Sequence, residues 1–343
     1  MDQFTHVKSL DGERPKKAAS RGCCGFLAGK KPPAFRQTLV LLRHSIRKDR
    51  EDPSWRGSQD GKDWPSDTPI TPAGYNMAKS VAKELQELHN EANFTAVACS
   101  PYRRCIETAS EVAKLLNLPM VLDQEMGEIW DDDIHQEPQP WRSNAELRPM
   151  CKELGINVLN PIIDGGFKLF GKKPKFPETL DSAKTRYIVR IETYLEQSSE
   201  TQQNFIIVTH ADALAAALVL FERGNANVQS MEYCARIIAK RSDTKAVKIA
   251  DSVDGAGVFA KMWDVKFKGL DVERFAAEKH MEKYYEKEHL EIVAAVDQHV
   301  AVRRKNRTKT DAMFMKTVHK MAKDPEDNEE DEEQDAAPAA NRT

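Results

Sequence analysis

The chain has 343 residues, of which 31% are charged and 40% are hydrophobic, and its formal net charge at pH 7 is −3. The total charge identifies no partner, because a basic beginning and an acidic end cancel, and we expect no DNA or RNA partner. No apolar run approaches the roughly 20 residues of a membrane-spanning helix, and the N-terminus lacks the apolar core of a signal peptide. Six cysteines at irregular spacing indicate neither a disulfide framework nor a metal site. We therefore expect a cytoplasmic protein.

The two ends of the chain differ in composition from its middle. Residues 1–34 are rich in lysine and arginine and poor in large apolar groups, which predicts a flexible basic arm. Cys23 and Cys24 in this arm could accept palmitate and dock on an anionic membrane, although two thiols on a flexible arm are the simpler interpretation. Residues 324–335 are nearly all acidic, so 324–343 should be a disordered acidic tail.

Between these ends, strand-like and helix-like patterns alternate. In chain order we predict strands at 37–42, 94–99, 120–122, 205–208, 233–239 and 245–250, and helices at 71–89, 104–116, 179–196 and 211–221. The first helix has Thr71 as its N-cap and Pro72 at its first position. Strands separated by helices indicate an α/β fold with a mostly parallel central sheet that is covered by helices on both faces.

Charged and histidine side chains directly follow four of these strands. They are Arg43, His44 and Arg47 after the first strand, Arg104 after the second, Glu128 after the third and His210 after the strand at 205–208. The carboxyl ends of parallel strands share one sheet edge, where open α/β sheets bind ligands. Arginine binds phosphate oxygens with two hydrogen bonds, a neutral imidazole can attack phosphorus, and a carboxylic acid can protonate the departing oxygen. The pattern predicts phosphoryl transfer through a histidine without a metal or cofactor, and it does not choose between His44 and His210.

These segments resemble the histidine phosphatase superfamily, which has the phosphoglycerate mutase-like fold. Residues 43–47 (Arg-His-Ser-Ile-Arg) are similar to its Arg-His-Gly-x-Arg signature, and residues 100–109 to its Ser-x-x-x-Arg-x-x-x-Thr-Ala helix. Residues 209–211 resemble the second histidine motif, and 231–235 match a further landmark. The likeness covers residues 36–270 and is closest to the phosphatase domain of the suppressor of T-cell receptor signalling proteins.

The resemblance implies a role for each residue of the predicted site. His44 would be the nucleophile that becomes phosphorylated, and Glu128 would act first as acid and then as base for the attacking water. Arg43, Arg104 and His210 would bind the phosphoryl oxygens, with Arg47 as an added contact.

Two positions depart from the family pattern. Ser45 replaces the glycine that usually follows the nucleophile, and Ala211 stands where glycine often follows the second histidine. Because a Cβ takes room that glycine leaves open, Ser45 could crowd the phosphate, or its hydroxyl could donate to it.

The function expected from this resemblance is that of a metal-independent phosphatase acting on a phosphomonoester. A phosphoprotein, in particular one carrying phosphotyrosine as for a protein tyrosine phosphatase-like enzyme, is preferred over a metabolite. A phosphoglycerate-type mutase is the enzymatic alternative. A phosphate-binding or scaffold module is the non-catalytic alternative, which a crowded Ser45 would favour.

The predicted phosphatase domain spans 35–270 and contains an insertion, 130–177, that should cap the sheet edge. Trp55, Trp64 and Trp130 could line the site of an aromatic leaving group, although core packing explains them equally well. Residues 271–323 have helical composition and should pack on their own domain or on a second copy in a homodimer. The cluster Arg303–Lys309 is compatible with a nuclear signal, and a solvated helix end is the simpler interpretation.

Overall fold

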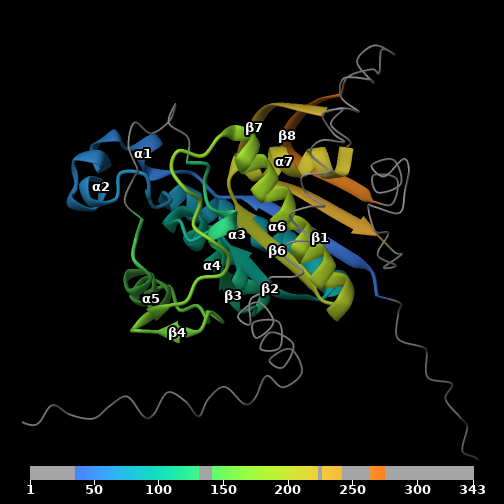
Figure 1. Ribbon diagram of the computed structural model, residues 1–343, viewed down its shortest axis with the longest axis horizontal. Coiled ribbons are helices and arrows are strands. Elements are labelled where there is room, and N and C mark those ends of the chain that lie inside the picture. The colour runs from blue at the N-terminus through green and yellow to red at the C-terminus, as the bar shows by residue number, and fades with distance from the viewer. Residues whose placement is uncertain (1–34, 131–140, 223–225, 242–262, 275–343) are drawn as a thin grey trace, which may run out of the picture. The chain divides into compact units, whose positions relative to one another are not determined.

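The computed structural model describes residues 35–130, 141–222, 226–241 and 263–274 (Figure 1). All of them belong to the compact unit that begins at Phe35. The predictions for the basic arm with Cys23 and Cys24, the strand at 245–250, the cluster at 303–309 and the acidic tail lie outside the described residues. Within the described part, no helix combines the length and the apolarity that crossing a bilayer requires.

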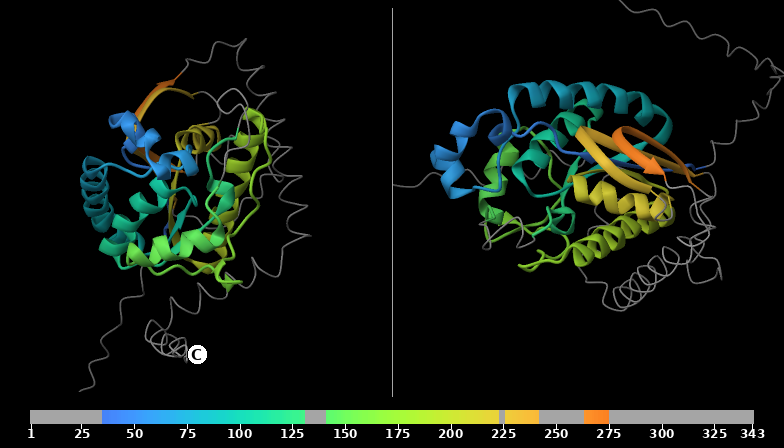
Figure 2. Two further views of the ribbon diagram at one scale, coloured as in Figure 1. Left: turned by 90° about the vertical axis from the view of Figure 1, so that its left-hand side faces the viewer. Right: turned by 90° about the horizontal axis from the view of Figure 1, so that it is seen from above.

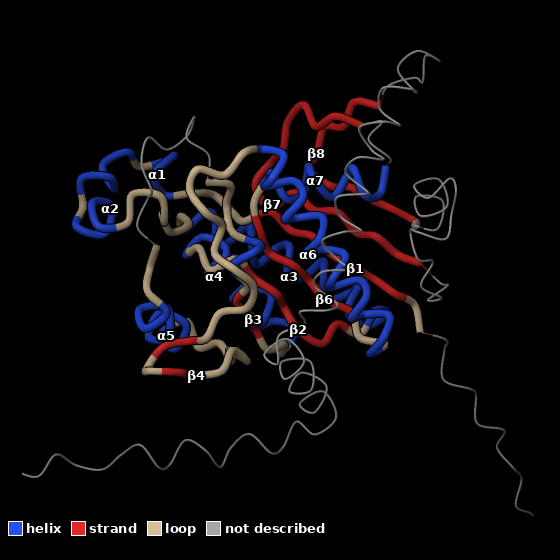
Figure 3. Tube along the Cα trace, in the orientation of Figure 1, coloured by secondary structure: helices blue, strands red, loops and turns tan. Residues whose placement is uncertain are grey.

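The central sheet has six strands in the order β3-β2-β6-β1-β7-β8 (Figure 3). They are β1 (Gln37–Arg43), β2 (Phe94–Cys99), β3 (Met120–Leu122), β6 (Asn204–Thr209), β7 (Ala226–Arg241) and β8 (Asp264–Arg274). The strands β3, β2, β6 and β1 run parallel, whereas β7 and β8 add antiparallel strands at one side. The predicted mostly parallel α/β sheet is therefore confirmed.

Alternating residues along the parallel strands enter two separate cores. Leu39 and Leu41 of β1 pack with α6 (Leu180–Thr201) and α7 (Ala211–Glu222). Val40 and Leu42 pack on the other face, with α3 (Pro72–Ala92) and α4 (Arg103–Leu116). Figure 2 shows α3 and α6 on opposite sides of the sheet. Because both faces are covered, the ligand-accessible part of a parallel sheet is its carboxyl edge.

The helix boundaries follow local capping chemistry. Thr71 caps α3 by accepting a hydrogen bond from the Gly74 backbone N–H, as predicted. The helix runs to Ala92, three residues beyond the predicted end, and stops where Asn93 adopts a left-handed conformation. Helix α6 begins after its N-cap Thr179 and ends at Gln202, which is also left-handed. The predicted ends were too early because the terminal turns lack an apolar pattern.

Strand β8 was not predicted from the sequence. Its antiparallel pairing with β7 extends through Val272 and Arg274, so the prediction that a helical extension begins at 271 is wrong for residues 271–274. The alternation of Val265 and Phe267, both packed against the core, was a usable signal for a strand. Residues from 275 onward lie outside the described part.

Short elements occupy the connections around the site. They are α1 (Lys48–Glu51), η1 (Pro53–Gly57) and α2 (Gln59–Asp63) after β1, η2 (Gln124–Met126) after β3, and α5 (Asn144–Glu153), β4 (Ile162–Ile163) and β5 (Gly166–Phe167) in the insertion. The described part of the insertion hydrogen-bonds to the outer edge of β3, through Asn157 and Leu159 on Met120 and through Phe170 on Leu122. It thus continues the sheet sideways beside the site.

Candidate active site

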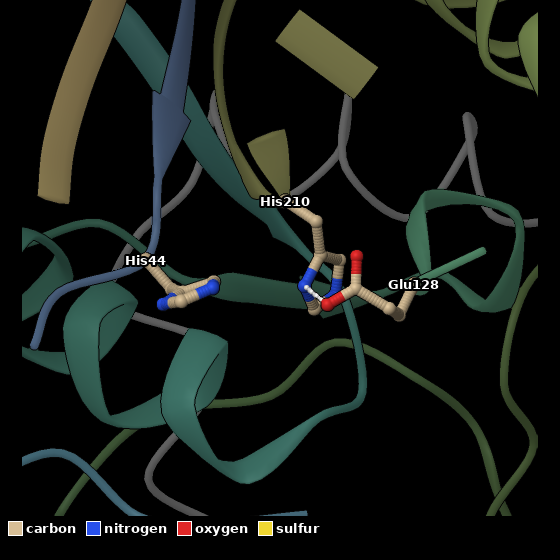
Figure 4. Close-up of side chains that lie close together, drawn as sticks. All are labelled: His44, Glu128 and His210. Carbon is tan, nitrogen blue, oxygen red and sulfur yellow. Dashed lines mark ion pairs between the residues drawn. The ribbon is translucent and has the colours of Figure 1, made fainter. Parts of the chain in front are cut away.

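Parallel pairing of β1 with β6 brings the two histidines to the same level of the sheet. Arg43 pairs with Thr209, and the His44 backbone N–H donates to the Thr209 carbonyl at 2.9 Å. The ring centroids of His44 and His210 are 5.4 Å apart with an interplanar angle of 64°. Figure 4 shows both rings and the Glu128 carboxylate close together, with His44 following β1, His210 following β6 and Glu128 following η2. The expected meeting of these side chains is therefore observed.

His44 is held as a neutral base. Its Nδ1 lies 2.9 Å from the Ser45 carbonyl oxygen, and because a carbonyl only accepts, Nδ1 carries the proton and Nε2 keeps its lone pair. Burial, reinforced by the nearby charge of Arg104, holds the pKa of His44 well below its usual 6.5. An uncharged imidazole with a free Nε2 is the form that can attack phosphorus.

His210 is fully buried and hydrogen-bonded through both ring nitrogens. Nε2 lies 2.8 Å from the Ser100 hydroxyl, and Nδ1 lies 3.1 Å from Glu128 Oε2. A carboxylate accepts, so we assign the proton to Nδ1 and let the Ser100 hydroxyl donate to Nε2. Burial lowers the pKa of His210 to about 4, so it is neutral at pH 7.

Buried Arg104 and partly exposed Glu128 form an ion pair beside His210. Arg104 is only 1% exposed, and its guanidinium donates to the Ser66 carbonyl and to Glu128 Oε2, each at 2.8 Å. Burial opposes the charge of Arg104, but Glu128 outweighs it and raises the pKa. Burial likewise opposes the charge of Glu128, yet its pKa is held well below 4.5, because His210 donates a hydrogen bond to the carboxylate and the charge of Arg104 lies beside it.

This arrangement places a carboxylate oxygen in an anion position. Glu128 Oε2 receives hydrogen bonds from Arg104 Nη2 at 2.8 Å and from His210 Nδ1 at 3.1 Å. The same two donors are those that the resemblance assigns to a phosphoryl oxygen. Glu128 therefore occupies a position with the donors that an oxyanion requires.

Arg43 and Arg47 have different surroundings. Arg43 donates to the Met231 carbonyl, and its guanidinium lies 4.7 Å from the Tyr233 ring centroid. Burial lowers the pKa of Arg43 from 12.5. Arg47 makes two hydrogen bonds of 2.9 Å to the Asp49 carboxylate, through Nε and Nη2 of its guanidinium. A phosphate contact by Arg47 stays a prediction.

Ser45 does not act in either of the two expected ways. Its hydroxyl donates to the Gly74 carbonyl at 2.7 Å, and its side chain is completely buried against the start of α3. The hydroxyl is therefore already used and makes no donor for phosphate. Because the side chain packs against α3, the departure from glycine is accommodated without filling the anion position.

Two site residues were missed. Tyr233 lies 5.9 Å from the His44 ring, and a register break in β7 between Met231 and Arg236 places it there. Bulges of this kind re-aim side chains beside active sites, and the family landmark at 231–235 was the available sequence signal. Asp212, in the first turn of α7, hydrogen-bonds to Glu128, and burial together with Glu128 raises its pKa to about 6. Its position two residues after His210 was the available clue.

Donor atoms of His44, Glu128 and His210 lie within 4.8 Å of one another, a spacing that a metal ion could use. The charge environment disfavours a cation, since Arg104 lies 2.8 Å from the same carboxylate and both nitrogens of His210 are engaged. The metal-free site predicted from the sequence therefore remains our expectation.

Residues 39–147 match the model of the histidine phosphatase superfamily (branch 1). The match to that superfamily is limited to this segment. A stretch of 68 residues is 38% identical to the transcription factor tau 55 kDa subunit of Saccharomyces cerevisiae, covering 20% of this chain and 15% of that protein. The chain thus matches only a small part of this relative's length.

The solved structures that are similar to this chain are more distant in sequence. The ecdysone phosphate phosphatase from Bombix mori, in complex with tungstate, is 20% identical with a TM-score of 0.49, covering 71% of this chain and 96% of that one. A phosphoglycerate mutase from Bacillus anthracis is 17% identical with a TM-score of 0.37, covering 60% and 88%. Similarity at this level assigns neither activity nor substrate. The closer likeness to suppressor of T-cell receptor signalling proteins stays a prediction.

Proposed function

We propose that this protein is a metal-independent phosphatase that hydrolyses a phosphomonoester through a phosphohistidine on His44. The observation that carries the proposal is the anion position between Arg104 and His210, next to a neutral imidazole whose Nε2 keeps its lone pair. The match of residues 39–147 to the model of the histidine phosphatase superfamily supports the same chemistry.

In the first step the phosphoryl group displaces Glu128 from its two donors. An Nε2–P bond forms at His44 as the P–O bond to the leaving group breaks, and Arg104 and His210 hold the equatorial oxygens. Glu128 has then lost its contact with Arg104 and lies next to a phosphate anion. Because a nearby like charge raises the pKa of a carboxyl group, Glu128 binds a proton. It then gives this proton to the departing oxygen.

In the second step Glu128 is a carboxylate again and accepts a proton from water. The water oxygen attacks phosphorus, the Nε2–P bond breaks, and the electron pair returns to His44. Inorganic phosphate leaves, Glu128 returns its proton to solvent, and the carboxylate recovers its hydrogen bonds to Arg104 and His210. The protein supplies every other group; the attacking water and the proton that Glu128 exchanges come from solvent.

A phosphoprotein carrying phosphotyrosine is the substrate that we propose for this reaction. The support is the likeness of the motifs at 43–47, 100–109 and 209–211 to the signalling-type phosphatases of the superfamily. The substrate is thus a finer proposal than the phosphatase chemistry, and hydrolysis of another phosphomonoester would leave the chemistry intact.

The test is hydrolysis of p-nitrophenyl phosphate in excess chelator, inhibited by vanadate. His44→Asn should abolish turnover, whereas His89→Gln, at the opposite end of the sheet near the start of β2, should retain it. An acid-labile phosphoryl label trapped on His44 would support the proposal directly. Absence of turnover with intact phosphate binding would instead identify a binding module, and transfer between phosphoglycerates would identify a mutase.

A further inference from the structure

A row of aromatic rings leads away from the catalytic histidines. The Tyr102 ring lies 5.1 Å from His210 and 5.2 Å from Trp141, both in edge-to-face geometry. Trp141 in turn lies 5.5 Å from Trp130. We call Tyr102, Trp130 and Trp141 the aromatic wall. Tyr102 and Trp130 are each 5% exposed, whereas Trp141 is partly exposed and is therefore the member that a ligand can touch.

The aromatic wall lies on the side of the site where the leaving group departs. Glu128, the proposed acid, is preceded by Gly127 and followed two residues later by Trp130. A Cβ added at Gly127 would stand 3.1 Å from the Trp141 ring and 3.6 Å from the Tyr102 ring, so the backbone beside the acid touches the wall. A leaving oxygen within hydrogen-bonding reach of Glu128 consequently places its substituent next to these rings.

The aromatic wall contains hydrogen-bond donors that have no partner in the described part of the chain. The indole Nε1 atoms of Trp130 and Trp141 are buried and have no hydrogen-bond partner in the described part of the chain. Buried donors are normally satisfied, so such orphans indicate a missing acceptor. The Lys173 ammonium lies 4.7 Å from both indole centroids, and burial lowers its pKa. Two unpaired N–H donors and one cation favour an acceptor that carries negative charge.

The other tryptophans considered from the sequence do not contribute. Trp55 is 5% exposed within η1, and the Trp64 ring lies under the guanidinium of Arg142 at 5.2 Å. Of the three tryptophans expected to surround an aromatic leaving group, only Trp130 lies in the wall, and it is joined there by Trp141.

We propose that the aromatic wall and Lys173 form a leaving-group subsite for aryl phosphates that bear an anionic group near the ring. The inference rests on the proposed function and deepens it. The planar ring would stack on Trp141, and the anion would meet Lys173 and the indole N–H groups. An acidic phosphotyrosine segment and a small carboxylated phenyl phosphate share this chemistry.

Binding of phosphonates tests the subsite without requiring turnover. Methylphosphonate, phenylphosphonate and 4-carboxyphenylphosphonate would be titrated calorimetrically into the full chain. The wild type should bind the phenyl compound about threefold to tenfold more tightly than the methyl compound, as expected for one aromatic contact. The carboxylate should add about twofold to fivefold, the range of an exposed ion pair.

Two variants and one control separate the contributions. Trp141→Leu should remove the preference for phenyl over methyl, and Lys173→Gln should remove only the gain from the carboxylate. Lys175→Gln, an exposed lysine two residues away, should change neither ratio. Thermal midpoints within about 2 °C of the wild type would establish that each variant is folded.

The outcomes distinguish the two proposals. Equal binding of phenyl and methyl compounds by the wild type, or a preference that survives in Trp141→Leu, would overturn the subsite while leaving His44-dependent hydrolysis untouched. Selective binding without any turnover would retain the subsite and refute the phosphatase. Failure to bind any phosphonate would refute both.

Discussion

The carboxyl pair formed by Asp212 and Glu128 offers a quantitative test of the site. Asp212 hydrogen-bonds to Glu128, and burial, followed by the charge of Glu128, raises its pKa from 3.8 to about 6. The folded protein therefore holds this proton more tightly than the unfolded chain does. The resulting stabilisation is fully present below pH 3.8 and is lost as the pH rises to about 6.

At neutral pH the ionised Asp212 thus makes folding less favourable. Each pKa unit corresponds to about 1.4 kcal/mol, so the difference between 3.8 and about 6 amounts to about 3 kcal/mol as an upper limit. Asp212→Asn removes the charge and keeps a donor for Glu128. We expect the variant to have a free energy of unfolding up to about 3 kcal/mol higher than the wild type at pH 7.5, and nearly the same at pH 4.

The measurement is urea unfolding followed by tryptophan fluorescence at both pH values. Asp264→Asn, an exposed carboxyl at the start of β8, serves as the matched control and should show no such pH-dependent difference. Two results would refute the raised pKa of Asp212. One is a variant that is less stable than the wild type at pH 7.5, and the other is a stability difference that is the same at both pH values.

Three further outcomes follow from the geometry. Ser45→Ala should lose about 1 kcal/mol of stability with its hydrogen bond to Gly74 but keep kcat/KM within about twofold, measured on an aryl phosphate. Arg104→Met should leave Glu128 without its cation and destabilise the fold by about 3 kcal/mol or more, with loss of vanadate binding. Because the pKa of His44 lies well below 6.5, kcat/KM for an aryl phosphate should not fall between pH 7 and 6, as it would for an ordinary imidazole nucleophile. A decline centred near pH 6.5 would contradict that state of His44.

The residues that converge in the site were predictable because each follows a buried apolar strand. The runs ending before Arg43, His44 and His210 became β1 and β6, and their parallel register brings the two imidazoles together. Arg104 was predictable for the same reason, as the first turn of α4 directly follows β2. Local sequence was therefore sufficient to predict the position of a site residue when that position is set by the strand that precedes it.

Features that depend on two distant segments were not predictable. The Ser45 hydroxyl points away from the anion position because it donates to the Gly74 carbonyl, and this contact depends on where α3 begins. Tyr233 reaches His44 only through the register break in β7. Trp141 lies beside the site because its ring contacts Tyr102, which follows another strand. Each is a tertiary pairing that neither periodicity nor motif spacing encodes.

The carboxylate of Glu128 between Arg104 and His210 also bears on how the cycle ends. In the proposed reaction, inorganic phosphate released from His44 would compete with an internal anion that is tethered to the same donors. Such a competitor weakens the binding of any oxyanion by the free energy gained when Glu128 re-forms these contacts. It should therefore reduce product inhibition. Substitution of Glu128 by an uncharged residue would be expected to create a slow enzyme that retains its product.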